Sequence, residues 1–142
     1  MGRLKSYGLA IFLACTGLTG YAEQCDGLRI VKSQMPVYPP IGVAARMDAR
    51  VSLSIEVSKD AKIINVRLNS GANWFTAKAE DYVNSMVLEW DSPGTHNACT
   101  QTVIVNYKIL PEFSDLGFRR VTVNSISDIL IEAKQHTPTV NY

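Results

Sequence analysis

The side chains of this 142-residue chain that are best suited to metal binding or catalysis are three cysteines and two histidines. Cys15, Cys25 and Cys99 are far apart in the sequence, and so are His96 and His136. A structural metal site usually draws on closely spaced Cys or His pairs, such as C-x-x-C, and this chain has none. The sequence therefore predicts neither a metal site nor a cofactor.

Serines and carboxylates give no convincing catalytic set. Ser52 and Ser54 alternate with apolar residues, as on the solvent side of a strand. Glu80 and Asp81 fall on the polar side of a helical pattern, where carboxylates need no special role. His96 stands in a polar loop without a partner at ligand spacing. We expect a protein that is not an enzyme. A pocket that contains both His96 and a carboxylate would instead support an enzymatic function.

The first 22 residues have the pattern of a secretory signal peptide. Arg3 and Lys5 form a positive start, residues 9–14 are apolar, and residues 20–22 read Gly-Tyr-Ala, a small-x-small cleavage site. The apolar run is much shorter than the roughly 20 residues that cross a bilayer, so a membrane anchor is the weaker interpretation. A lipoprotein cleaved at Cys15 is also weaker, because the residue three positions before it is not leucine. We expect an exported chain without a membrane span.

Cleavage at this site would leave two cysteines, Cys25 and Cys99. An even pair in an exported protein is most simply a disulfide. Closing so long a loop stabilises a fold by about 4 kcal/mol in the chain-entropy model. The bond would connect the N-terminal segment to the loop before the last core strand.

The charge pattern excludes two classes of partner. The formal net charge falls from +1 to −1 when Arg3 and Lys5 leave with the signal peptide, and neither sign clusters in the sequence. Nucleic acids and anionic membranes attract concentrated basic residues. We therefore expect neither as a partner.

Residues 51–57 give the strongest structural signal. Apolar residues occupy every second position of this run (Val51, Leu53, Ile55 and Val57). This period of two predicts a half-buried strand. Residues 63–68 alternate again (Ile64, Val66 and Leu68) after a polar turn at residues 59–62. The two runs predict an antiparallel hairpin with one apolar face.

From residue 75 to residue 90 the period becomes helical. Apolar residues recur at steps of three and four (Phe75, Ala79, Tyr82, Val83, Met86, Val87 and Trp90). Thr76 is the expected N-cap, and a shorter helix is expected over residues 41–47, behind Pro40. A third strand over residues 102–109 turns its alternate residues to the core (Val103, Val105, Tyr107 and Ile109). The predicted fold is α+β: a small three-stranded antiparallel sheet with one helix packed on one face.

Three segments follow from these patterns: the signal peptide at residues 1–22, a domain at 23–110 and a C-terminal extension at 111–142. In the extension, residues 118–123 predict an edge strand. Ser125 and Asp128 have the spacing of a capping box. They predict a short helix that would carry four apolar residues (Ile126, Ile129, Leu130 and Ala133).

The order of features over residues 38–109 resembles the C-terminal domain of the TonB family. The resemblance rests on Tyr38-Pro39, Ala44-Ala45, the hairpin, Ser70-Gly71, a helix ending in Trp90 before Pro93, and the final strand. It covers about half of the chain. Ala49 and Ala61 stand where the family usually has glycine.

The resemblance implies a soluble periplasmic module that recognises an extended segment of an envelope protein by strand addition. In the family, the final strand pairs with a segment of an outer-membrane transporter. The implied contact residues here are on that strand and in the Tyr-Pro pair (Thr102, Ile104, Asn106, Lys108, Tyr38 and Pro39). The chain has no transmembrane helix and no Pro-rich spacer, so we expect recognition without force transmission.

Two alternatives remain open at this stage. Residues 118–123 could pair with the final strand and close its edge to any partner. The chain could also be a structural, inhibitory or accessory periplasmic protein with a different contact surface and no transport role. The sequence does not set the oligomeric state.

Overall fold

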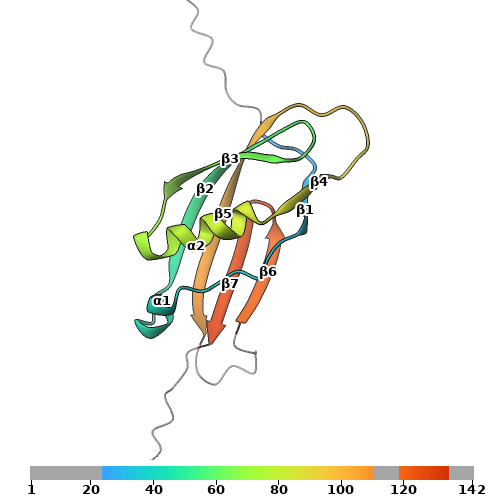
Figure 1. Cartoon of the computed structure of the whole chain (residues 1–142). Helices are drawn as coiled ribbons and strands as arrows, with labels where there is room; N and C mark the ends of the chain where they lie inside the picture. The colour runs from blue at the N-terminus through green and yellow to red at the C-terminus, as the bar shows by residue number, and fades with distance from the viewer. Residues whose placement is uncertain (1–23, 111–118, 135–142) are drawn as a thin grey trace, which may run out of the picture.

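A computed structural model describes residues 24–110 and 119–134, so the predicted signal peptide lies outside the described residues. The elements are β1 Leu28–Lys32, α1 Pro40–Ala44, β2 Ala49–Val57, β3 Ile63–Ser70, α2 Asn73–Asn84, β4 Val87–Trp90, β5 Cys99–Leu110, β6 Arg119–Ser125 and β7 Asp128–Lys134. Figure 1 shows α2 lying across one face of the main sheet, with β1 and β4 at one end of the helix. None of the helices in these ranges is long and apolar enough to cross a membrane.

The main sheet is larger than the sequence predicted. It has five strands in the order β3-β2-β5-β7-β6, and β1 pairs with β4 in a separate two-stranded sheet. All pairs in the main sheet are antiparallel except β5 with β7, which is parallel. The α+β class is confirmed, but the three-stranded antiparallel sheet is wrong. The C-terminal extension supplies the two additional strands.

The predicted hairpin is confirmed as β2 and β3, which pair antiparallel. In its turn, Ala61 has a φ of 61°, a left-handed value that glycine adopts more easily. The register shifts twice, and in each shift β3 carries the additional residue, Ile64 or Asn69. A bulge of this kind turns the chain, so Ile64 is 65% exposed and does not face the core as predicted.

The core lies between α2 and the sheet. Alternate residues of β2, β5 and β7 are fully buried there (Val51, Leu53, Ile55, Val57, Val103, Val105, Tyr107, Ile129 and Ile131). From α2, the helical stripe of Phe75, Ala79, Tyr82 and Val83 packs against them. The expectation that Leu53 and Val105 share one buried face beneath the helix is therefore confirmed. The opposite sheet face, called the open face below, carries mainly polar residues.

The helix α2 is shorter than predicted. It ends at Asn84, and its last predicted turn is instead the strand β4, which pairs with β1. Leu88 is buried while Val87 and Glu89 are exposed, which is the alternation of a strand. The helix also lacks a side-chain cap at its start. Thr76 donates its hydroxyl hydrogen to the Asn73 carbonyl, so the predicted N-cap is wrong.

The predicted C-terminal helix is also wrong, whereas the predicted strand over residues 118–123 is confirmed as β6. Residues 125–128 form the turn of the β6–β7 hairpin, and β7 follows directly. Ile129, Ile131 and Ala133 are buried at every second position, whereas a helix would have brought Ile129 and Ala133 together. β7 binds β5 in parallel, so it closes the side of β5 that the sequence left open.

Candidate protein-binding surfaces

The strand β5 lies between two neighbours. β2 pairs with residues 99–107 on one side, and β7 pairs with residues 104–110 on the other. A further strand therefore cannot pair with residues 104–110 of β5 in this structure, which contradicts the prediction that the last strand is an open edge there. The alternative that residues 118–123 pair with this edge is also wrong, because β6 pairs with β7, and it is β7 that pairs with β5. The four predicted contact residues lie on the open face, either exposed or half-buried (Thr102, Ile104, Asn106 and Lys108).

Tyr38 and Pro39 belong to the core and not to a binding surface. Both are buried. The Tyr38 ring packs edge-on against Phe75 and Tyr107, with centroid distances of 5.7 Å and 5.3 Å. Its hydroxyl donates a hydrogen bond to the Met47 carbonyl. Burial, together with the charge of nearby Asp48, raises the pKa of Tyr38 above its ordinary range.

Tyr107, on β5, has the more unusual environment. It is fully buried, and its hydroxyl has no hydrogen-bond partner among the described residues. Burial raises the pKa of Tyr107, and the neighbouring Tyr38, Tyr82 and Asp81 raise it further. A buried hydroxyl without a partner costs free energy. The hydroxyl of Tyr107 therefore lowers the stability of the core relative to a phenylalanine at this position.

The predicted disulfide between Cys25 and Cys99 is present, with 5.1 Å between the Cα atoms. It connects the segment before β1 to the first residue of β5. Next to it, Gln24 forms an isolated parallel bridge with Thr100. The bond thus fixes the N-terminal side of β1 to the central strand of the main sheet.

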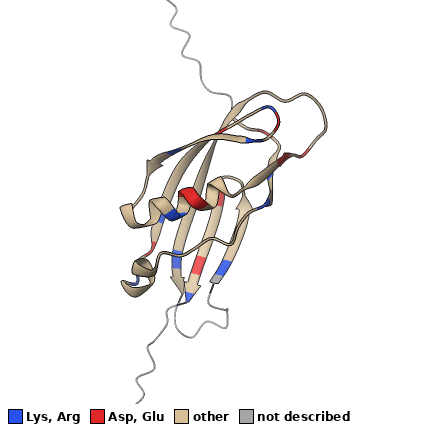
Figure 2. Ribbon diagram, viewed as in Figure 1, with Lys and Arg blue, Asp and Glu red and all other residues tan. Residues whose placement is uncertain are grey.

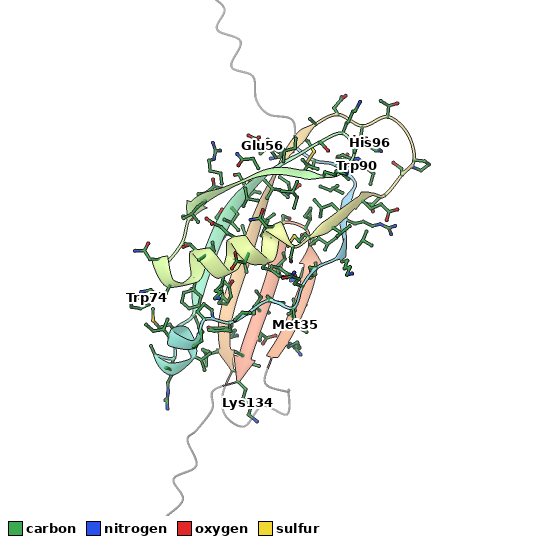
Figure 3. The ribbon with its side chains drawn as sticks, in the orientation of Figure 1. Met35, Glu56, Trp74, Trp90, His96 and Lys134 are labelled. Carbon is green, nitrogen blue, oxygen red and sulfur yellow. A yellow bond between two sulfur atoms is a disulfide. The ribbon has the colours of Figure 1, made fainter. Side chains whose placement is uncertain are left out.

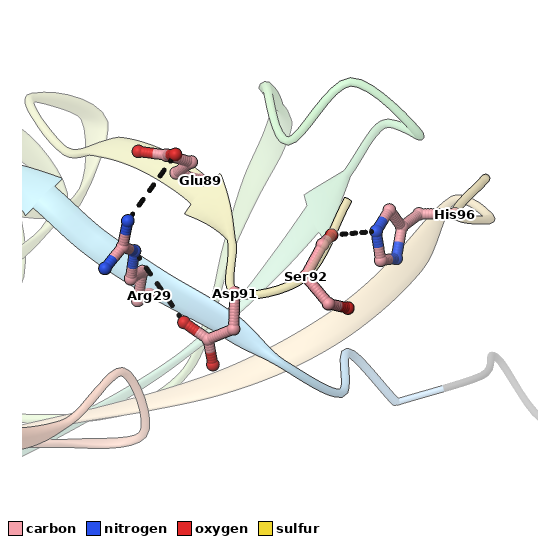
Figure 4. A network of polar contacts seen from close by, with 5 residues as sticks. All are labelled: Arg29, Glu89, Asp91, Ser92 and His96. Carbon is pink, nitrogen blue, oxygen red and sulfur yellow. Dashed lines mark hydrogen bonds and ion pairs between the residues drawn. The ribbon is translucent and has the colours of Figure 1, made fainter. Parts of the chain in front are cut away.

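Beside the disulfide, the Trp90 indole and the His96 imidazole are stacked in parallel, with ring centroids 4.3 Å apart. The Trp90 Nε1–H donates to the Lys59 carbonyl. His96 Nε2 lies 2.9 Å from the Ser92 carbonyl (Figure 4). Because a carbonyl only accepts, Nε2 carries the proton and is not free to act as a base. Trp90 therefore holds the loop of residues 92–98 in place, as a packing residue outside the helix to which we had assigned it.

The surroundings of this stack are polar and largely exposed to solvent. Arg29 reaches Glu89 at 3.5 Å and Asp91 at 3.7 Å, and all three side chains are more than half exposed (Figure 4). An open hollow of about 350 Å³ lies between the disulfide and His96. Within residues 24–110 and 119–134, no three His, Cys, Asp or Glu side chains gather as metal ligands. Ion pairs that are exposed to solvent in this way contribute little to the stability of the fold.

The free sides of the main sheet are those of its outer strands, β3 and β6. In the described part of the chain, no other strand pairs with the outer side of either. Each outer strand presents backbone N–H and C=O groups that a further strand could bind. These two strands therefore form the outer edges of the main sheet.

The edge of β3 is apolar and only lightly charged. Nearly all of its residues are exposed, including Ile64 and Leu68 at 65% and 40%. Arg67 is its single charged residue, and it has no proline. Its two bulges leave residues 65–68 as a regular stretch. Proteins protect exposed edges with charges and with bulges. The two bulges protect the ends of β3, and the regular stretch between them has only one charge, that of Arg67.

The edge of β6 is charged and connected to its neighbour. Its first two residues are Arg119 and Arg120. Arg120 binds Glu132 of β7 at 2.9 Å, and Glu132 is only 4% exposed. Lys108 of β5 stands beside Glu132 in register. Figure 2 shows this row as a red segment of β7 between blue segments of β5 and β6.

Comparison with solved structures finds several chains that are similar to this one. The chain is similar to the solution NMR structure of the Pseudomonas aeruginosa TonB CTD, with 17% sequence identity and a TM-score of 0.48. The alignment covers 56% of this chain and 84% of that one. No family model matches the sequence. No curated protein matches it either. A likeness at this level does not establish a shared function.

The sequence pattern did not indicate the exposed apolar edge of β3, because it placed Ile64, Val66 and Leu68 together on one buried face. Its signal was present: the apolar residues of the 63–68 run are Ile63, Ile64, Val66 and Leu68, which is one more than strict alternation allows. An additional apolar residue in an alternating run is typical of a bulge. That excess could have indicated an exposed apolar side chain on an outer strand.

Proposed function

We propose that this domain is a protein-binding module that takes an extended segment of an envelope protein as an additional strand on β3. The observation that carries the proposal is the exposed, weakly charged outer edge of β3, with Leu68 and Ile64 beside it. Backbone hydrogen bonds along such an edge supply affinity, and alternate side chains supply selectivity. The bound segment adds a sixth strand to the sheet.

The side chains of the regular stretch define the segment that fits. Val66 and Leu68 lie on the side of β3 that pairs with the core residues of β2, while Asn65 and Arg67 lie on the open face. A segment with an apolar residue opposite Leu68 and an acidic one opposite Arg67 complements both faces. The chemistry of the partner is therefore an extended peptide that alternates apolar with polar or acidic residues.

An envelope location is part of the proposal. The predicted signal peptide at residues 1–22 directs export, and the Cys25–Cys99 disulfide fits an oxidising compartment such as the periplasm. The proposed partner is accordingly another protein of the same compartment. An outer-membrane transporter is the example that the family resemblance suggests.

A second candidate function has its own support. The closed edge of β5 and the exposed apolar residues around α2 favour an accessory, structural or inhibitory protein that uses the helix side for contact. In that case a partner would bind away from β3. The two candidate functions differ in the residues whose substitution should weaken partner binding: those of β3 in the first and those of the helix side in the second.

The test uses a display library of random peptides of about ten residues, selected on the purified protein. We expect selected peptides to alternate apolar and polar residues. Leu68→Lys should weaken their binding by roughly tenfold or more, because it places a charge beside the added strand.

The matched control is Val123→Lys on β6, because Val123 is 46% exposed and Leu68 is 40% exposed. It should leave the affinity unchanged. Equal loss in both variants, or loss only in Val123→Lys, would refute binding on β3. Circular dichroism of both variants verifies that the fold is intact.

A further inference from the structure

Apolar side chains gather on the helix side of the molecule. Nine large hydrophobic side chains are exposed in the described parts of the chain. Six of them lie on residues 31–41, on α2 or at the start of β4 (Val31, Met35, Val37, Ile41, Trp74 and Val87). Exposed apolar side chains that lie next to one another mark interaction sites, whereas scattered ones are common on any surface.

A stripe along α2 supplies the polar groups of this surface. Trp74, Lys78, Asp81 and Ser85 follow one another at steps of four, three and four residues, so they lie on one side of the helix. Lys78 and Asp81 also line a shallow groove of about 120 Å³ with residues 34–37. The stripe thus has an aromatic residue at one end and one cation and one anion in its middle.

The segment before α1 runs antiparallel to α2. The Gln34 N–H donates to Ser85 Oγ at the end of the helix, at 3.1 Å. Tyr38, four residues later, packs on Phe75 near the helix start. Met35 therefore lies beside the C-terminal half of α2.

Apolar groups are consequently present at both ends of the helix. Trp74 and Ile41 lie near its N-terminal end, and Met35 and Val87 lie near its C-terminal end. Figure 3 shows Trp74 beside α1 and Met35 further along α2. An arrangement with matching apolar groups at the two ends and opposite charges between them is self-complementary.

We propose that this surface binds a second copy of the chain, with the two α2 helices antiparallel across a two-fold axis. An axis between Lys78 and Asp81 brings each Lys78 to the Asp81 of the other copy. The same axis brings each Trp74 to the level of Ser85 in the other copy, beside its Met35. In a two-fold interface every contact occurs twice, so one complementary pair gives two.

The charges favour a second copy over a membrane. The middle of the stripe has one positive and one negative side chain, Lys78 and Asp81, whereas helices that lie on anionic lipid carry a cationic polar face. Antiparallel helices also place the positive end of each helix dipole near the negative end of the other. A second copy matches both features.

The test measures the dimerisation constant of the purified protein by sedimentation equilibrium, at concentrations up to roughly 1 mM. We expect a concentration-dependent dimer. Lys78→Asp and Asp81→Lys should each weaken dimerisation at least about tenfold, because each creates two like-charge contacts. Trp74→Ala should weaken it as well.

Two rescues make the test specific. An equal mixture of the Lys78→Asp and Asp81→Lys variants should form heterodimers, because the mixture restores two opposite-charge pairs. The double variant with both substitutions should form homodimers again. Far-ultraviolet circular dichroism verifies that every variant is folded.

Leu68→Lys, the variant that tests peptide binding on β3, should leave dimerisation unchanged, so the two proposals fail independently. A protein that stays monomeric up to roughly 1 mM would overturn self-association and leave the helix side to a different protein. Failure of both charge-swap rescues would overturn the proposed two-fold pairing.

Discussion

Two hairpins flank the central strand β5, and they form very different edges of the same sheet. In the first, β2 is buried on its core face while β3 is largely exposed and twice bulged. In the second, four of the seven residues of β7 are buried, and Arg120 of β6 is paired with Glu132 of β7. The β6–β7 hairpin therefore stabilises the fold, whereas β3 of the β2–β3 hairpin has no partner strand on its outer side in the described part of the chain.

The difference teaches where a partner strand can be accepted. An outer strand with charged residues, one of them paired with the buried Glu132, is protected against further pairing. An outer strand with exposed apolar residues and a single arginine is less protected. The sheet thus has one protected and one weakly protected outer edge, and the proposed function uses the weakly protected one.

The largest difference between the hairpins should appear when one isoleucine is removed from each. Ile131 of β7 is 1% exposed and Ile64 of β3 is 65% exposed. Ile131→Ala should lower the free energy of unfolding by about 3 kcal/mol, since it leaves a cavity in the core. Ile64→Ala should change it by less than about 0.5 kcal/mol. Urea titration followed by circular dichroism measures both, and similar losses would contradict the assignment of β3 as an outer strand.

A smaller loss of stability is expected from breaking the ion pair between Arg120 of β6 and Glu132 of β7. Arg120→Ala leaves the buried carboxylate of Glu132 without its partner. Because Arg120 is about half exposed, we expect a loss of roughly 2 kcal/mol, below the cost of a fully buried pair. Arg67→Ala on β3 is the matched control and should be nearly neutral. If the two variants melt alike, Glu132 does not anchor β6.

The smallest expected changes concern two tyrosines of the shared core. Tyr107→Phe removes a hydroxyl without a partner and should be neutral or stabilising by up to about 1 kcal/mol. Tyr38→Phe removes the hydrogen bond to Met47 and should cost about 1 kcal/mol. Calorimetric melting of the two variants measures both changes. A larger loss in Tyr107→Phe would show that its hydroxyl has a partner after all.

The same tyrosines set a pH dependence. Burial raises the pKa of both above the ordinary value of 10.0, so the folded state holds these protons more tightly than the unfolded state. Their contribution is therefore fully present below pH 10 and is lost as the pH rises further. Tyr107→Phe should flatten this alkaline loss of stability, as measured by denaturant titration at several pH values.

The secondary structure of a segment could be predicted from the sequence where its local pattern fits only one structure, and could not where pairing with a distant segment decides it. The alternation at residues 51–57 predicted β2 correctly, because a strand with one buried and one solvated face shows its period directly. The disulfide followed from Cys25 and Cys99 being the only pair left after signal cleavage. The stripe from Phe75 to Val83 likewise predicted the buried face of α2.

The errors arose where a local pattern fitted two structures. Ile126, Ile129, Leu130 and Ala133 fit a helical face, and Ile129, Ile131 and Ala133 fit a strand equally well. The parallel pairing of β7 with β5 decided between them, and a pairing over such a distance leaves no local signal. The same holds for Trp90, which continued the helical spacing but pairs with β1 as part of β4.

The candidate site could not be predicted from the same pattern. The contact residues assigned to β5 depended on that strand being an edge, which β7 prevents. The exposed edge of β3 depends on its two bulges and on the strand order. The additional apolar residue in the 63–68 run indicates one bulge, but the strand order is not encoded within a single segment.

The most direct test of the proposed function is amide hydrogen exchange, measured on the protein alone and with a selected peptide. If the peptide adds to β3, outward-facing amides between Ile63 and Ser70 should gain protection on binding, while those of β6 stay unchanged. Protection confined to β6, or to α2 without β3, would contradict strand addition at this edge.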